Sequence, residues 1–198
     1  MYFDIAQLDY KKCYKLLAST VVPRPIAWVI SSDKNGVINA APFSFFNFFS
    51  GFPPVICLGV GYKDGKPKDT LFNIMNSGEF IINMVTENLA EKMNETAYPF
   101  SSDVDELRKT GLDTKQGIKI KLPFISESPV AIECIKKEII SIDTTAKLII
   151  GHVVGIHIND EAITDPEKLY INTEKLKLIG RMESPGWYIR TEDRFKIR

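Results

Sequence analysis

Pro25-Ile-Ala-Trp-Val-Ile30, followed by Asp33-Lys-Asn-Gly36 and then by Val37-Ile38, is the stretch that decides the fold. Its first part is a short apolar run that contains β-branched residues, which is typical of a strand. Asn35-Gly36 supplies the positive-φ residues that a tight hairpin turn needs. The stretch therefore predicts two antiparallel strands joined by a short turn.

Similar patterns recur along the chain. Strands are expected over residues 55–62, 79–85, 130–140 and 147–158, and the last two are long enough to coil around a barrel. Helices are expected from Asp69-Thr70 to just before Gly78, over 86–96, and from Ser102, with Asp105 at capping-box spacing, to just before Gly111. Many strands without regular strand–helix alternation predict a mainly β fold, an antiparallel barrel with a few short helices. Nothing marks a linker, so residues 1–198 are expected to form one domain.

The composition excludes several classes of protein. The chain has 198 residues, and 25 Lys and Arg balance 25 Asp and Glu. A net charge of zero gives no general attraction to nucleic acid or to an anionic membrane, so neither is an expected partner. No basic segment followed by an apolar run opens the chain, and no apolar stretch approaches the roughly 20 residues that span a bilayer. Three distant cysteines, Cys13, Cys57 and Cys134, indicate reduced thiols in a cytoplasmic protein.

The most unusual segment is Asn39-Ala-Ala-Pro-Phe-Ser-Phe-Phe-Asn-Phe-Phe-Ser-Gly-Phe-Pro-Pro54. Small polar residues alternate with phenylalanines, while prolines and a glycine interrupt the strand ladder. Such a segment can offer backbone polar groups and aromatic side chains to a flat ligand with polar edges, as an isoalloxazine requires. The alternative is a phenylalanine-rich barrel wall or dimer interface.

A second segment, Lys66-Pro-Lys-Asp-Thr70, leads directly into a predicted helix. Free N–H groups at a helix start, the Thr70 hydroxyl and the Lys68 ammonium together suit a phosphate. The alternative is an ordinary helix start capped by Asp69. Only the two segments together favour flavin mononucleotide (FMN).

Arg24 stands between two prolines and is expected on a stiff backbone. Its guanidinium could face a phosphate or a flavin, or close a surface ion pair. His152 and His157 are five residues apart on a predicted strand, so they are expected on opposite faces and no metal site is predicted. The acidic segment Asp103-Val-Asp-Glu106 is expected to be the solvated start of a helix. There is no Walker sequence and no G-x-G-x-x-G motif.

At this point the sequence resembles the flavin reductase-like FMN-binding split-barrel family, and within it the flavoredoxin-type branch. The resemblance is carried by Val22-Pro-Arg-Pro-Ile-Ala27, Asn39-Ala-Ala-Pro-Phe-Ser44, Ser50 with Pro53-Pro54, Lys68-Asp-Thr70 with Asn73, Glu79-Phe80 with Asn83-Met84, Asp105-Glu106 with Gly111-Leu112, Gly151-His-Val153, and Gly180-Arg181 before Tyr188. These motifs cover nearly the whole chain in the order of the family. The phenylalanine-rich loop and His152 depart from the usual pattern.

The resemblance implies a homodimer of split barrels with FMN near the subunit interface. The isoalloxazine would lie along residues 44–47 and the phosphate near Lys68 and Thr70, with residues around Arg181 and Trp187 lining the pocket or coming from the partner. The predicted cofactor-binding residues are Arg24, Asn39, Ser44, Phe45, Phe46, Asn47, Ser50, Lys68, Thr70 and Asn73. Backbone N–H groups of the phenylalanine-rich segment are the first candidates to stabilise charge at flavin N1 and the C2 carbonyl, and Arg24 is the second.

The expected chemistry is carried by the cofactor. A hydride passes from NADH or NADPH to flavin N5, and the electrons pass to a second acceptor, so no catalytic side chain is predicted. Three alternatives remain open: an FMN electron carrier reduced by a protein partner, a protein that supplies diffusible flavin to a monooxygenase, and a ligand-binding barrel without catalysis.

Overall fold

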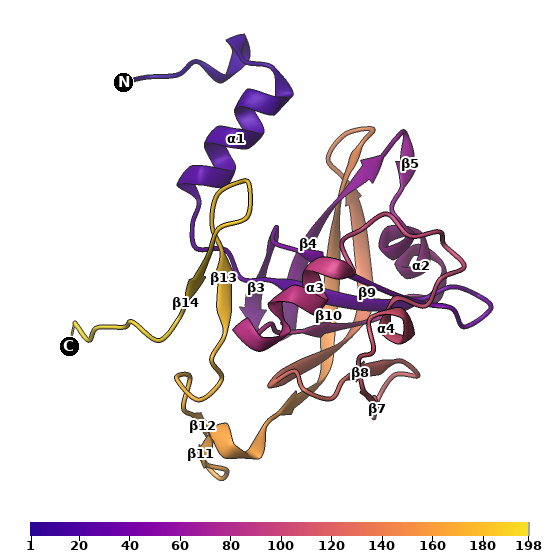
Figure 1. Ribbon diagram of the computed structural model, residues 1–198, viewed down its shortest axis with the longest axis vertical. Coiled ribbons are helices and arrows are strands. Elements are labelled where there is room, and N and C mark those ends of the chain that lie inside the picture. The colour runs from indigo at the N-terminus through magenta and orange to yellow at the C-terminus, as the bar shows by residue number, and fades with distance from the viewer. Residues whose placement is uncertain (198) are drawn as a thin grey trace.

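The computed structural model describes residues 1–197, and an eight-stranded antiparallel sheet that curls on itself dominates it (Figure 1). The path of hydrogen-bonded neighbours runs through β2 (Ile38–Phe43), β1 (Ala27–Ser32), β6 (Glu79–Asn83), β9 (Val130–Ser141), β10 (Ala146–Ile158), β4 (Pro54–Lys63) and β3 (Phe46–Gly51), and β5 (Lys66–Pro67) pairs with β4. Three small ladders complete the strands: β7 (Thr114–Gln116) with β8 (Pro123–Ile125), β11 (Ile163–Asp165) with β12 (Tyr170–Ile171), and β13 (Ile179–Arg181) with β14 (Tyr188–Arg190). The predicted mainly β fold is confirmed.

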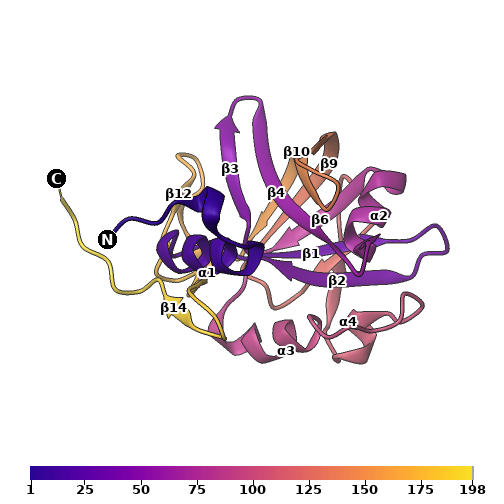
Figure 2. The ribbon, with the colours of Figure 1, turned by 90° about the horizontal axis from the view of Figure 1, so that it is seen from above.

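The helices are short and lie around the sheet (Figure 2). They are η1 (Ile5–Gln7), α1 (Tyr10–Thr20), α2 (Asp69–Ser77), η2 (Glu87–Leu89), α3 (Ala90–Glu95), α4 (Glu106–Lys109) and η3 (Asp160–Ala162). Among the residues described, no helix combines the length and the apolar character needed to cross a membrane.

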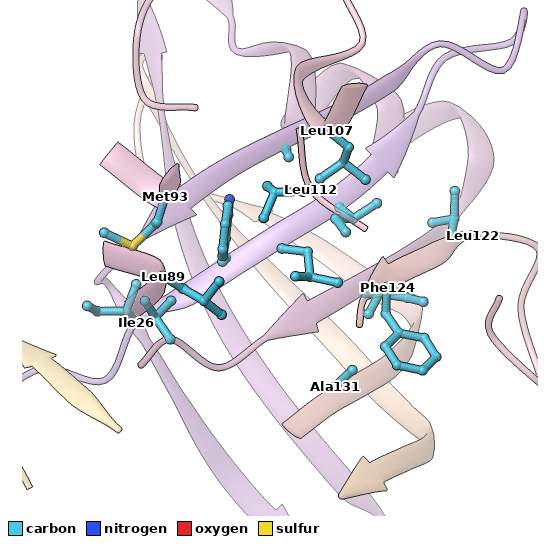
Figure 3. Close-up of a cluster of buried hydrophobic side chains, with 14 of the residues drawn as sticks. Ile26, Leu89, Met93, Leu107, Leu112, Leu122, Phe124 and Ala131 are labelled. Carbon is cyan, nitrogen blue, oxygen red and sulfur yellow. The ribbon is translucent and has the colours of Figure 1, made fainter. Parts of the chain in front are cut away.

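Strand β1 is buried on both faces, which explains its continuous apolar sequence. Trp28 and Ile30 belong to one hydrophobic cluster, which η2, α3, α4 and the segment that leads to β8 cover (Figure 3). Val29 points the other way, into a second cluster that fills the barrel together with Leu71 and Ile74 of α2. The two clusters hold β1, and therefore its neighbour β2, in a fixed position.

The hairpin of β1 and β2 forms as the sequence predicts. Ala27 pairs with Phe43 and Ser32 pairs with Ile38, and Gly36 in the turn has a φ of 82°. Helix α2 ends where expected, at Gly78 with a φ of 75°. The predicted start of the third helix is wrong, because Asp105 and not Ser102 caps α4: the Asp105 side chain accepts a hydrogen bond from Arg108 N at 3.0 Å.

The expected orientation of the two histidines is also wrong. A bulge between Val153 and Gly155 takes up one residue of β10, so His152 pairs with Ile135 and His157 pairs with Ala131. Those partners are four residues apart on β9 and share a face. His157 Nε2 contacts the buried Glu133 carboxylate at 2.6 Å and its ring stacks on Phe124. Among the described residues, no group of three or more His, Cys, Asp or Glu side chains could hold a metal ion.

Helix α1 was not expected from the sequence. Asp9 caps it by accepting a hydrogen bond from Lys12 N, and only Ala18 among its residues is buried. The helix lies beside the β13–β14 hairpin and projects away from the barrel (Figures 1 and 2). In the single chain, α1 therefore leaves most of its apolar side chains exposed, among them Tyr10, Tyr14 and Leu17.

Candidate functional site

The outer side of β2 is the centre of the candidate site. β2 ends the path of paired strands, so one side of its backbone has no strand neighbour. Ala40 N faces outward and donates to Glu106 Oε2 at 2.8 Å. Pro42, two residues on, faces the same side. Because no strand pairs with β2 on that side, the missing N–H of proline costs the sheet no hydrogen bond.

Two cavities adjoin along this strand. We name the first the Ser44 cavity; its volume is about 540 Å³ and it is lined by Ile26, Pro42, Phe43, Ser44, Ala90, Glu91, Met93, Asn94, Ala97, Arg181, Pro185, Gly186 and Tyr188. The second, the Lys68 cavity, has a volume of about 600 Å³, and among the residues that line it are Asn39, Lys63, Lys66, Lys68, Thr70, Tyr98 and Phe100. They share Pro42, Phe43 and Ala97 as lining residues, so the two cavities adjoin, and we call them together the cleft.

The Lys68 cavity has the properties of an anion site. Lys68 is the N-cap residue of α2 and provides no side-chain cap, so the first N–H groups of this nine-residue helix have no capping side chain. Its ammonium lies 5.4 Å from the centre of the Phe43 ring. Burial and the neighbouring charge of Lys63 lower the pKa of Lys68. A bound anion would offset both effects.

A polar network lies beneath this end of the cleft. Thr70, which is 1% exposed, donates to Asn39 Oδ1 at 2.7 Å, and Asn39 Nδ2 donates to both Glu106 oxygens at 3.1 and 3.2 Å. Asn73 donates to Ser31 Oγ in the same region. Three of the predicted binding residues, Asn39, Thr70 and Asn73, are therefore neighbours in space.

Glu106 corrects the expectation of a solvated acidic segment. Glu106 is only 6% exposed, because its side chain turns inward and accepts a hydrogen bond from Ala40 N on the edge of β2. Burial raises the pKa of Glu106 to about 7 in spite of the hydrogen bonds from Ala40 and Asn39, and the charge of Asp69 adds to the rise. The sequence held one signal for the structural role of this segment. If Asp105 is taken as the cap, Glu106 becomes the first residue of the helix and not part of a solvated acidic run.

The Ser44 cavity has a different character. Its floor comes from β2 and its walls come from α3 and from the β13–β14 hairpin. The Arg181 guanidinium lies 4.8 Å from the centre of the Tyr188 ring and donates to Pro185 O at 3.2 Å. Its lining combines apolar side chains such as Ile26 and Met93 with polar ones such as Ser44 and Asn94. Such a mixture suits an aromatic ligand with polar edges. The contribution of α3 through Glu91 and Asn94 had no recognisable motif in the sequence.

Arg24 lies deep beside this cavity and does not line it. The residue is 7% exposed, and its donors reach Ala18 O, Val21 O and Met182 O at 2.6, 2.7 and 2.8 Å, with Nε at 3.3 Å from Ser44 Oγ. These bonds use most of the five guanidinium donors. The expectation of a surface ion pair is wrong, because Arg24 ties α1 and the C-terminal hairpin to Ser44. A contact between Arg24 and the cofactor stays a prediction.

Four other predicted residues lie outside the cleft of the single chain. The Phe45 ring packs 6.0 Å from that of Tyr14, and Phe46 packs against the barrel cluster. Asn47 Oδ1 accepts from the backbone N–H of Phe48, and Ser50 lies opposite Val55 in the β3–β4 ladder. Their part in cofactor binding stays a prediction.

A third, mostly apolar cavity of about 640 Å³ lies between α1 and the strands β4 and β10. Tyr10, Tyr14, Leu17 and Phe45 line it and are all exposed. Phe48, Phe49 and Phe52 of the neighbouring hairpin are 72%, 67% and 96% exposed. We call these residues together the aromatic surface.

A split barrel with such a cleft on its edge strand, cationic at one end and of mixed polarity at the other, is typical of the class of split-barrel flavoproteins. The chain belongs to the flavin reductase-like family, because the sequence model described as "Flavin reductase like domain" matches residues 18–178.

Solved structures with related sequences agree with this assignment. The chain is 33% identical to the 2-nitrobenzoate 2-nitroreductase NbaA of Pseudomonas fluorescens, with a TM-score of 0.91 and coverage of 100% of this chain and 95% of that one. It is 31% identical to nitrilotriacetate monooxygenase component B of Bacillus cereus, with a TM-score of 0.92 and coverage of 100% and 98%. Flavoredoxin of Desulfovibrio vulgaris (Miyazaki F) shares the fold, at 17% identity, a TM-score of 0.77 and coverage of 100% and 97%. The resemblance to the flavin reductase-like family found in the sequence is thus confirmed.

Proposed function

We propose that this chain is an FMN-binding oxidoreductase that accepts hydride from NADH or NADPH and passes the electrons to a second acceptor. One observation carries the proposal: a cationic cavity at Lys68 and Thr70 adjoins a cavity at Ser44 that has both apolar and polar walls. A phosphorylated flavin has the same two parts, an anion and a ring. The donor set therefore fits FMN.

The residues of the cleft would hold the cofactor as follows. Lys68, Thr70 and the start of α2 bind the phosphate, and Ser44 with the shared wall of Pro42 and Phe43 positions the ring. Bound FMN supplies the hydride and electron chemistry. The chain would orient the ring, and the space between α3 and the β13–β14 hairpin is where a nicotinamide would enter. We assign no catalytic side chain.

A homodimer completes this proposal. Adjacent exposed aromatic residues on one side of a monomer indicate a contact surface, and the aromatic surface extends from α1 onto the β3–β4 hairpin. A second copy seated there would cover Phe45 and the residues after it. In a dimer Asn47 and Ser50 would approach the cleft of the partner subunit, which would account for their place in the motif.

The second acceptor depends on the partner. The relative at 31% identity is named as a component of a monooxygenase, and this favours a role in which the chain supplies reduced flavin to such an enzyme. The flavoredoxin-like alternative is an electron carrier that a protein partner reduces. Free thiols at Cys13, Cys57 and Cys134 support a reducing, cytoplasmic location.

The proposal is tested by anaerobic reduction. Purified protein is mixed with FMN, dialysed, and examined for flavin absorbance, and NADH or NADPH is then added in separate samples. We expect bound flavin after mixing and its bleaching by one or both nicotinamides. Bound flavin that neither nicotinamide bleaches would favour the electron carrier, and no bound flavin together with no FMN turnover would overturn the oxidoreductase.

A further inference from the structure

Glu106 stands at one end of a chain of three hydrogen-bonded side chains that reaches the cationic cavity. Its carboxylate accepts from Asn39 Nδ2, and Asn39 Oδ1 accepts from Thr70 Oγ1 at 2.7 Å. Glu106, Asn39 and Thr70 all line the Lys68 cavity. The chain therefore links a buried acid to the hydroxyl nearest the start of α2.

The order of donors in this chain follows from Glu106 being ionised. A carboxylate can only accept, so the Asn39 amide must turn its NH₂ group toward Glu106 and its oxygen toward Thr70. The Thr70 proton is then committed to Asn39. What Thr70 presents to the cavity is an oxygen lone pair, and a phosphate oxygen, which is also an acceptor, gains nothing from it.

Protonation of Glu106 reverses the order. The carboxylic O–H can donate to Asn39 Oδ1 once the amide turns over, and Nδ2 then donates to Thr70 Oγ1. Thr70 is released to donate its own proton into the cavity. Ala40 N keeps its acceptor at Oε2, since a protonated carboxyl group still accepts.

We propose that Glu106 is a positioning residue that takes up a proton from solvent when a phosphorylated flavin binds, and that this proton converts Thr70 from an acceptor into a donor toward the phosphate. The inference rests on the proposed function. It makes the binding of the phosphate, and not that of the ring, dependent on pH.

The charges around Glu106 favour this proton uptake. Asp69 of α2 and Asp33 of the β1–β2 turn line a small cavity of about 180 Å³ together with Glu106. On its own helix, Asp105 and Arg108 pair with each other at 3.4 Å. Lys63 and Lys68, which face the Lys68 cavity, oppose protonation of Glu106, and a phosphate held there would offset their charge. Because burial already brings the pKa of Glu106 to about 7, the uptake requires little free energy near neutral pH.

The test compares FMN with riboflavin, which lacks the phosphate, between pH 7 and pH 9. Above pH 7 a phosphate monoester is already almost fully ionised, so its own titration contributes little. Affinity is measured by quenching of flavin fluorescence on the full chain. For the unmodified protein we expect FMN affinity to fall by up to about tenfold per pH unit, the limit for one coupled proton, and riboflavin affinity to change little.

The variant Glu106→Gln gives the sharper result. Its side-chain NH₂ donates to Asn39 as a protonated carboxyl would, so Thr70 stays a donor at every pH. We expect this variant to bind FMN more tightly than the unmodified protein at pH 9 and with a smaller pH slope, and the slope that remains reports on Lys68. Glu95→Gln, an exposed carboxylate on α3, is the matched control and should keep the original slope.

Several outcomes would overturn the inference. Equal pH slopes in the unmodified protein and Glu106→Gln, or weaker FMN binding by that variant at every pH, would show a merely structural role. If Glu106→Gln does not fold, Thr70→Val serves instead: calorimetry at pH 7.5 in buffers of different ionisation heat should show less proton uptake with FMN than in the unmodified protein, and equal uptake would refute the coupling. FMN binding without the coupling leaves the proposed function intact, whereas no FMN binding at any pH overturns both.

Discussion

Arg24 is a buried side chain that joins separate segments beside the site. Its guanidinium donates to carbonyl oxygens at the end of α1 and at Met182. Hydrogen bonds from a charged group contribute about 1.5–3 kcal/mol each, and Arg24→Ala leaves these carbonyls without their partner. We expect a loss of about 3 kcal/mol, which lowers the melting temperature by roughly 6–12 °C for a chain of this length. Thermal unfolding measures this.

The same variant distinguishes two roles of Arg24. Arg108→Ala, which removes an exposed guanidinium on α4, is the control and should leave the melting temperature nearly unchanged. If Arg24→Ala kept its melting temperature and lost FMN affinity instead, Arg24 would be a direct ligand of the cofactor.

Lys68 differs from Arg24, because we expect its ammonium to contact the bound cofactor rather than other parts of the chain. Replacing Lys68 by Gln removes the ammonium beside Phe43 and should weaken FMN by about tenfold or more, since a charge-assisted hydrogen bond contributes about 1.5–3 kcal/mol. Riboflavin affinity should change little. Fluorescence titration measures both, with Lys137→Gln on the exposed side of β9 as the control. An equal loss for both flavins would place the phosphate elsewhere.

At the scale of elements, the sequence predicted those whose signals are local. The β1–β2 turn and the end of α2 both depend on a glycine with positive φ, and both formed where expected. Prediction from the sequence failed where a contact between segments distant in the chain determines the local structure. The bulge between Val153 and Gly155 is set by pairing with β9. Helix α1 was missed for another reason: Tyr10, Tyr14 and Leu17 have helical spacing, but the single chain leaves all three exposed.

The loop before β8 offers a test at this scale. The Glu133 carboxylate on β9 accepts from the backbone N–H groups of Ile118, Lys119 and Ile120 at 2.7–2.9 Å, and from His157. Burial of Glu133 by itself raises its pKa, but these hydrogen bonds outweigh burial and the pKa is lowered. Glu133→Gln should cost about 2 kcal/mol of unfolding free energy at pH 7, because it loses a charged acceptor and sets an NH₂ group against N–H donors.

The pH dependence of this cost has a definite sign. A carboxylate whose pKa is lower in the folded state stabilises the fold above the unfolded value, and the contribution is lost as pH falls through the folded value. The difference in stability between the unmodified protein and Glu133→Gln should therefore shrink as pH falls below the ordinary pKa of 4.5. Denaturant unfolding at pH 7 and pH 3.5 measures it, with Glu138→Gln on β9 as the control. A difference that stays constant between these pH values would contradict the role of the charge.

At the scale of the whole molecule, the candidate site joins segments that are far apart in the sequence. Ser44 and Thr70 were predicted to meet, and they lie in adjoining cavities because α2 packs against β1 and β2. The wall that α3 adds through Glu91, and the inward turn of Glu106, depend on where those helices dock on the sheet. No local pattern specifies docking, so the sequence could predict the two ends of the cleft and not its sides.

The aromatic surface gives the prediction that concerns the molecule as a whole. If a second copy covers it, the protein should sediment at twice the 22.4 kDa mass of the chain. The double variant Phe48→Asp, Phe49→Asp places two charges where apolar area would be buried, and burying an unpaired charge is strongly unfavourable. We expect this variant to sediment as a monomer, while Ile118→Asp, an exposed apolar residue in the β7–β8 segment, stays a dimer.

The monomeric variant also shows whether the cleft of one chain is sufficient. Lys68, Thr70 and Ser44 all come from one chain, so the phosphate should still be recognised, and FMN should still bind more tightly than riboflavin. If Asn47 and Ser50 of a second copy contact the ring, the affinities for FMN and riboflavin should fall by the same factor when the dimer dissociates. Unchanged affinity for both flavins in a proven monomer would contradict a cleft that two subunits share.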